Sequence, residues 1–186
     1  MNFFKKPFVA IIVCILVVII STTVSINSKL SNKYGEVIDN FYEGKISNGF
    51  VVDSIYGNIV NMYELADEVV IIADNYGVDT RELVSNIAII KDNLSYKNTD
   101  ISEIYDIYAD FYNSLWAVEI ELSGIQLSQR HMEYMSSAAD QIYNLKLSIE
   151  KADYNEGVNT FYKKFDRFPA RIFIEMFDIG YPDYFA

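Results

Sequence analysis

Few side chains in this sequence could support chemistry, and His131 is the first to consider. It is the only histidine, and Glu133 follows two residues later. No Glu-x-x-His pair is present, so the carboxylate-and-histidine pattern of di-iron helix bundles is missing. A tetrahedral zinc site draws on His and Cys ligands that this chain does not have. The sequence therefore predicts no metal and no cofactor, and His131 is expected to be a solvated residue near a helix start.

The remaining reactive side chains also favour unremarkable roles. Glu119 and Glu121 are close in sequence, but a solvated helix face explains them better than a calcium site does. Cys14 is the only cysteine and lies in an apolar run, which excludes an intramolecular disulfide and a thiolate site. The sequence contains no G-x-S-x-G, P-loop or H-E-x-x-H motif. We therefore expect no catalytic residues and no enzymatic activity.

The charge is strongly acidic and unevenly distributed. All 26 Asp and Glu residues follow residue 26, together with 13 of the 15 Lys and Arg, so this part has a net charge of −13. Nucleic-acid binding needs basic surface to displace counterions, so no nucleic-acid partner is expected. The same sign argues against a domain lying flat on anionic lipid. Solubility is the simplest use of the acidity.

The start of the chain predicts a membrane anchor. After a tail of residues 1–6, no charge occurs from Pro7 to Ile26. At ~1.5 Å per residue this run is long enough to cross a ~30 Å hydrocarbon core, so we expect a transmembrane helix over 7–27. A cleaved secretory signal is the alternative, but Thr23-Val24-Ser25 matches a small-x-small cleavage site poorly. The pattern favours a retained anchor.

The orientation follows from the basic residues that flank the run. Lys5 and Lys6 precede it and place the N-terminus inside, whereas Lys29 and Lys33 weaken that bias. We therefore expect a single-pass protein of the cell membrane that contacts lipid through its N-terminal helix. Its helical domain is expected to be extracytoplasmic.

The rest of the chain, residues 28–186, reads as an all-α domain. No proline occurs between Pro7 and Pro169, and apolar residues recur at steps of three and four, which is typical of a coiled-coil-like helical seam. We expect an antiparallel bundle of about four long helices. Their predicted ranges are 28–75, weakened near "YEGKISNG", then 80–95, 100–123 and 128–168.

Turn chemistry supports these boundaries. Gly77 can stop a helix, and Asp79 with Glu82 three residues later forms a capping-box pattern. Thr99 or Asp100 can cap the next helix. Because four alternating helices return the chain to its starting end, the last segment is expected near the membrane end of the bundle.

The closing segment is rich in rings. Pro169 ends the long helix, and "ARIFIEMF" predicts a short helix that Gly180 stops. This segment either caps the open end of the core, which is favoured, or forms an interfacial foot at headgroup level. The residues of this capping or interaction surface are Phe168, Phe173, Met176, Phe177, Tyr181, Tyr184 and Phe185.

The same segment resembles the ending of LemA family proteins. The residues that carry the resemblance are Asp153-Tyr154-Asn155, Val158, Phe168-Pro169, Met176-Phe177, Pro182 and Tyr184-Phe185. The family pattern reads DYN, a helix, FP, a short apolar helix around MFGF, and a terminal PYF; this chain has Asp178-Ile179 in place of Gly-Phe. The resemblance implies one transmembrane segment and a long-helix domain, and it brings no catalytic residues. It also implies an N-terminus outside, opposite to the orientation that the charges favour.

Three function classes follow from these expectations. A membrane-anchored interaction or scaffold protein needs only a helical surface and a tether, and we expect this role, with another membrane or envelope protein as partner. An enzyme would need a polar cluster facing the core. The alternative is a ligand-sensing accessory domain of a membrane complex, since the six residues before the span cannot transmit a signal alone.

Overall fold

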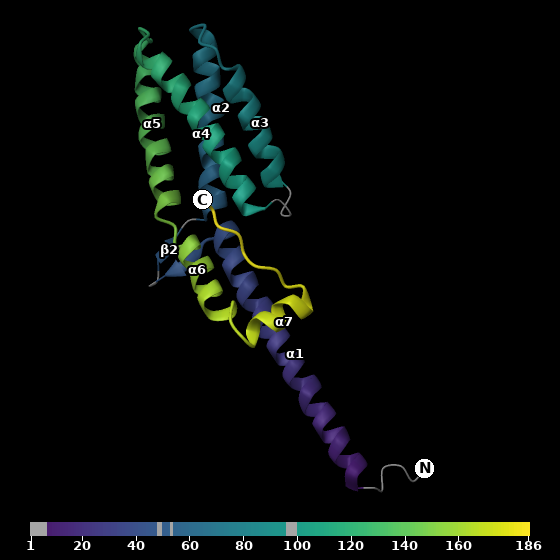
Figure 1. Cartoon of the computed structure of the whole chain (residues 1–186). Helices are drawn as coiled ribbons and strands as arrows, with labels where there is room; N and C mark the ends of the chain where they lie inside the picture. The colour runs from purple at the N-terminus through teal and green to yellow at the C-terminus, as the bar shows by residue number, and fades with distance from the viewer. Residues whose placement is uncertain (1–6, 48–49, 53, 96–99) are drawn as a thin grey trace. The chain divides into compact units, whose positions relative to one another are not determined.

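The described part of the chain is all-α apart from one short pair of strands. A computed structural model describes residues 7–47, 50–52, 54–95 and 100–186 (Figure 1). Its elements are α1 (Pro7–Tyr42), β1 (Lys45–Ser47), β2 (Phe50–Val52), α2 (Ile55–Asn75), α3 (Arg81–Ser95), α4 (Ile101–Ser123), α5 (Gln129–Glu150), α6 (Tyr154–Phe165) and α7 (Ala170–Phe177).

The prediction of one continuous helix over 28–75 is wrong. The expected membrane segment continues without a break to Tyr42, where α1 ends, and Gly44 then adopts a positive φ of 76° that few residues other than glycine accept. Two short antiparallel strands follow, with Lys45 opposite Val52. Ser54 restarts the helix because its side chain accepts a hydrogen bond from the Gly57 N–H at 2.8 Å.

The helix ranges expected for the middle of the chain are confirmed. Helices predicted over 80–95 and 100–123 are observed as α3 and α4. Gly77 has a φ of 75° just after α2, which is the predicted helix stop. Asp100 is the N-cap residue of α4 in backbone conformation, although its side chain makes no capping hydrogen bond.

The helix expected over 128–168 is divided into α5 and α6. The helix ends at Glu150, and Lys151 and Ala152 close the last turn with backbone bonds to Leu147 and Ile149. The apolar stripe shifts to a new face at Tyr154, so an unbroken helix could not bury both halves of the stripe. The short helix predicted in "ARIFIEMF" is confirmed as α7.

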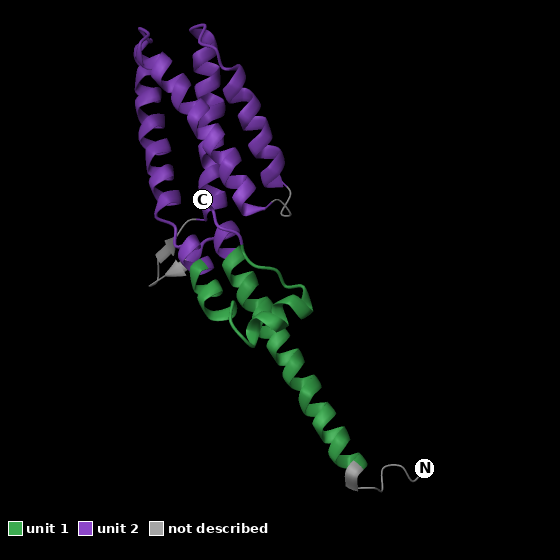
Figure 2. Cartoon of the chain, viewed as in Figure 1, with its two compact units in different colours: residues 1–38, 159–182 green, residues 39–158, 183–186 purple. Residues whose placement is uncertain are grey.

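The chain forms two compact units (Figure 2). Unit 1 consists of residues 1–38 and 159–182, and unit 2 consists of residues 39–158 and 183–186. The helical domain expected over 28–186 is therefore shared between them, and the division falls inside α1 and inside α6.

Unit 2 contains an antiparallel bundle of α2, α3, α4 and α5. The closely packed pairs are α3 with α4, and α2 with α3, α4 and α5. The predicted stripes supply much of the core, as expected from their spacing. Its fully buried large side chains in these helices are Ile55, Ile59, Met62, Val69, Leu83, Ile90, Ile104, Phe111, Leu115 and Leu122.

Unit 1 has a small aromatic core. Phe161 of α6 is 2 % exposed and meets Tyr34 of α1 edge-on at a centroid distance of 6.3 Å. Tyr181 stacks on Tyr162 at 5.1 Å, and Ile174 of α7 is buried. These contacts tie α1, α6 and the segment after α7 into one unit.

Among the described helices, α1 alone is long and apolar enough to cross a bilayer. Its large apolar side chains from Ile11 to Val24 are exposed, including Val17 and Val18 at about 60 %. No protein segment in the described part of the chain covers them. A hydrocarbon environment would remove this surface from water.

Candidate ligand-binding groove and the C-terminal segment

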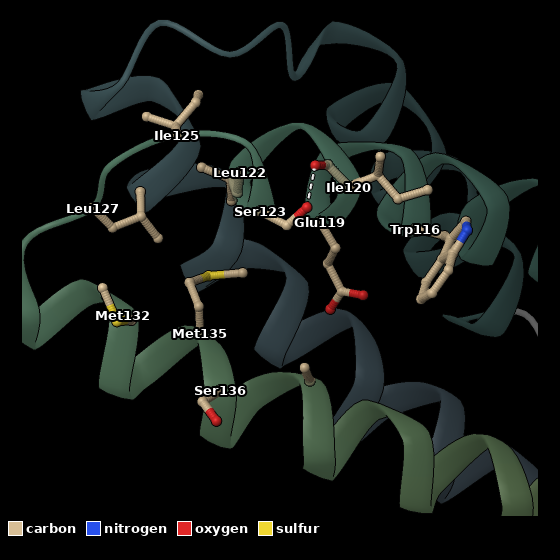
Figure 3. Close-up of a pocket in the computed structure, with 11 residues that line it drawn as sticks. Trp116, Glu119, Ile120, Leu122, Ser123, Ile125, Leu127, Met132, Met135 and Ser136 are labelled. Carbon is tan, nitrogen blue, oxygen red and sulfur yellow. Dashed lines mark hydrogen bonds between the residues drawn. The ribbon is translucent and has the colours of Figure 1, made fainter.

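An open apolar groove lies between α4 and α5 in unit 2 (Figure 3). Residues 124–128 connect the two helices, yet this pair is not among the closely packed pairs of the bundle. The space left between them measures about 470 Å³. It is lined by Trp116, Glu119, Ile120, Leu122, Ser123, Ile125, Leu127, Met132, Met135, Ser136 and Ala139.

The walls of the groove are exposed apolar side chains. Trp116 and Ile120 lie one helical turn apart on α4, and each is 54 % exposed. Met132 of α5 is 55 % exposed. Large apolar side chains gathered at one exposed place mark binding surfaces more often than isolated ones do. Because Met adapts to irregular shapes and Trp offers a flat ring, the groove can accept an apolar group.

One carboxyl group lies among these apolar side chains. The carboxylate of Glu119 points from α4 into the space between the helices (Figure 3), and its Oε1 is buried without a hydrogen-bond partner among the described residues. Burial raises the pKa of Glu119. The nearby Ser123 hydroxyl does not serve it, because it donates to the Ile120 carbonyl at 2.6 Å. The expectation of a solvated face holds for Glu121 but is wrong for Glu119.

At the other end of α4, away from the groove, Phe185 packs against the first turns of that helix. Phe185 is 6 % exposed, and its ring lies 5.1 Å from Tyr105 and 5.8 Å from Tyr108, both on α4. Two hydrogen bonds, each of 2.9 Å, connect the Asn155 side chain to the backbone of Phe185. Asn155 Oδ1 accepts from the Phe185 N–H, and Asn155 Nδ2 donates to the Phe185 carbonyl. Tyr154 also donates to the Asp183 carbonyl at 2.7 Å.

A pocket lies between this segment and the adjoining ends of α4 and α5. Lys146 and Glu150 of α5 line it together with Phe185 and Ala186. The Lys146 Nζ lies 4.8 Å from the centroid of the Tyr112 ring and 3.5 Å from the Glu150 carboxylate. Lys146 is therefore paired with Glu150, which lines the same pocket.

The seven residues predicted as a capping or interaction surface do not form one site. Phe168, Phe173, Met176, Phe177 and Tyr181 belong to unit 1, whereas Tyr184 and Phe185 belong to unit 2. Phe185 is buried, and Phe173, Phe177 and Tyr181 are half-buried. Phe168 is 84 % exposed, Met176 56 % and Tyr184 37 %.

Helix α7 buries a different face from the expected one. The spacing in "ARIFIEMF" predicts one apolar face made of Ile172, Phe173, Met176 and Phe177. The inward side instead carries Phe173, Ile174 and Phe177, with the two phenyl rings stacked at 6.1 Å. Ile172 is 51 % exposed and lies on the outer side with Met176. The helix therefore presents apolar surface on both sides.

The single histidine holds the α4–α5 connection to α2. Its Nδ1 lies 3.0 Å from the hydroxyl oxygen of Tyr76, which also accepts from the Ser128 N–H at 2.8 Å. Hydrogen bonding to Ser128 lowers the pKa of Tyr76. His131 is near a helix start as expected, but it is half-buried and bonded rather than simply solvated.

Polar groups in the bundle interior were missed by the sequence reasoning. Asn58 of α2 is 1 % exposed, and its Nδ2 has no partner within the described structure. It lines a second groove with Asn61, Gln141, Asn144 and Ser148. The described residues contain no group of three or more His, Cys, Asp or Glu side chains placed to hold a metal ion. The apolar spacing of Ile55 and Ile59 did not indicate that Asn58, which lies between them in sequence, is also buried.

Comparison of the chain with protein-family models, with curated proteins and with solved structures finds no match in any of the three.

Proposed function

We propose that this chain is a single-pass membrane protein of the LemA type whose helical part binds other components of the membrane or envelope and catalyses no reaction. The observation that supports this role most strongly is the exposed apolar surface of α1 from Ile11 to Val24. Exposure of this extent is costly in water and favourable in a bilayer. The resemblance of the ending to LemA proteins supports the same layout.

The division of charge between the two units agrees with this proposal. Unit 1 has 8 basic and 4 acidic residues, a net charge of +4, whereas unit 2 has 7 basic and 22 acidic residues, a net charge of −15. The unit that contains α1 therefore has the sign that anionic headgroups attract. The net charge of the whole chain hides this difference.

The outer side of α7 supports a second contact with lipid. Phe168, Ile172 and Met176 are all more than half exposed and belong to the same unit as α1. An interfacial foot, with these side chains at headgroup depth, accounts for their exposure. The inner side of α7 still acts as a cap, because Ile174 is buried. We propose that unit 1 uses α7 in both ways, with unit 2 on the extracytoplasmic side.

A second candidate function is ligand sensing as an accessory domain of a membrane complex. The open groove between α4 and α5 favours it, because an apolar space with one convergent polar group is typical of ligand sites. Partner binding and ligand binding can use the same surface. In both cases the groove is the part of unit 2 that engages another molecule.

Site-specific photocrosslinking in intact membranes tests the interaction role. A photoreactive residue replaces Ile120 in the groove, or Ile71 on α2 as a control, since these isoleucines are similarly exposed at 54 % and 55 %. The proposal predicts adducts of defined mass from position 120 and none from position 71. Identical adduct patterns from both positions, or none from position 120, would contradict it.

A further inference from the structure

We propose that the groove between α4 and α5 binds an organic ammonium ion that carries an apolar chain. This inference rests on the binding role proposed above for unit 2, and it does not depend on how the chain is anchored. It follows from the shape and lining of the groove and from the carboxylate within it, whose Oε1 is buried without a partner among the described residues.

The lining requires an apolar body in the ligand. Trp116, Ile120 and Met132 leave about half of their surfaces in water, although they stand around a space of about 470 Å³. A short alkyl or aromatic group in that space would remove this surface from water, which is favourable in proportion to the area covered. Ligands with a polar surface throughout would gain nothing from these walls.

The carboxylate requires a positive charge on the ligand. Glu119 Oε1 is buried, and no described donor reaches it. An anionic ligand would face this carboxylate across apolar walls, and a neutral ligand without a hydrogen-bond donor would leave it unpaired at the cost of its desolvation. A cation placed against Glu119 supplies the missing partner.

The cation is expected to be organic rather than a metal ion. Calcium takes six to eight oxygen ligands, and the groove offers one carboxylate with two serine hydroxyls, Ser123 and Ser136, among apolar side chains. A substituted ammonium ion is weakly hydrated and is attracted to an indole face. Trp116 lies one helical turn from Glu119 and lines the same groove (Figure 3), so both attractive groups are available together.

The test is a titration of the full chain in dodecyl maltoside, followed by the fluorescence of Trp116, the single tryptophan of the chain. The probes are hexyltrimethylammonium, hexanesulfonate with the same chain and the opposite charge, and tetramethylammonium without the chain. Glu119→Gln removes the charge and keeps the shape, and Glu121→Gln is the matched control at an exposed position of α4. Methyl NMR of Met132 and Met135 provides a second readout in the groove.

The expected result is saturable binding of hexyltrimethylammonium to the natural chain and to Glu121→Gln, and binding at least tenfold weaker to Glu119→Gln. Hexanesulfonate and tetramethylammonium are expected to bind at least tenfold more weakly than hexyltrimethylammonium. Equal binding of both hexyl probes, unaffected by Glu119→Gln, would overturn the ammonium assignment while leaving the groove as a binding surface. Absence of any response from Trp116 and the methionine methyls would overturn this inference and weaken the binding role itself.

Discussion

Removing the ring of Phe185 is expected to destabilise unit 2 strongly. The side chain is 6 % exposed and lies within 5.1–5.8 Å of the rings of Phe41, Tyr105 and Tyr108. Phe185→Ala removes this buried area and leaves a cavity, for which about 3–5 kcal/mol is usual. Since Phe185 lies in a segment without regular secondary structure that can partly collapse into the space, the lower end, about 3 kcal/mol, is expected.

Urea unfolding of the full chain in mild detergent measures this loss through Trp116, which lies on α4 of the same unit. With a urea slope of roughly 1–3 kcal/mol/M, a loss of about 3 kcal/mol lowers the midpoint by roughly 1–3 M. Phe168→Ala is the matched control, because that ring is 84 % exposed and its removal should change stability by less than about 0.5 kcal/mol. A loss below about 1 kcal/mol for Phe185→Ala, or a larger loss for Phe168→Ala, would refute the assignment of Phe185 as the anchored residue.

Three further predictions follow from the charges and surfaces. Burial raises the folded-state pKa of Glu119, so its protonation stabilises the fold at low pH, and that contribution is lost as the pH rises. Glu119→Gln should therefore raise the free energy of unfolding at pH 7 by less than about 1 kcal/mol, given the partial exposure of the side chain. In the same urea assay this gain should vanish on acidification. A bimane label at Met176→Cys, in a Cys14→Ser background, should be quenched by doxyl lipids in anionic vesicles, whereas a label at Ile71→Cys should not; equal quenching at both sites would remove the interfacial foot. Protease added to intact cells should digest the helical domain, and protection until lysis would reverse the proposed orientation.

Local patterns predicted the helices of the bundle better than their interruptions. The stripes of α3 and α4 and the glycine at Gly77 specify helices and a stop from residues close in sequence. A weakening near "YEGKISNG" was predicted, but not the complete break after Tyr42, and the break at Lys151 was not predicted, because apolar residues continue on both sides of each. The strongest local clue was present in each case: Gly44 at the first break, and the offset stripe beginning at Tyr154 at the second.

The groove and the anchored terminus could not be predicted from local patterns. Glu119 follows a polar spacing on α4, and its burial depends on the distance to α5, which sequence does not give. The contact of Phe185 with Tyr105 joins residues 80 positions apart. Such pairings depend on which helices pack closely against each other. Helices α4 and α5 do not pack closely, and local sequence patterns do not show this.

Retention of α1 in the membrane is the most direct test of the proposed role. The full chain is expressed, membranes are washed with alkaline carbonate, and the N-terminus of the retained protein is determined by mass spectrometry. We expect the protein to stay with the membrane and to contain the whole apolar run from Pro7 to Ile26. Release of a chain that begins near residue 22 or 26 would show that the run is a cleaved signal and would contradict the membrane-anchored account.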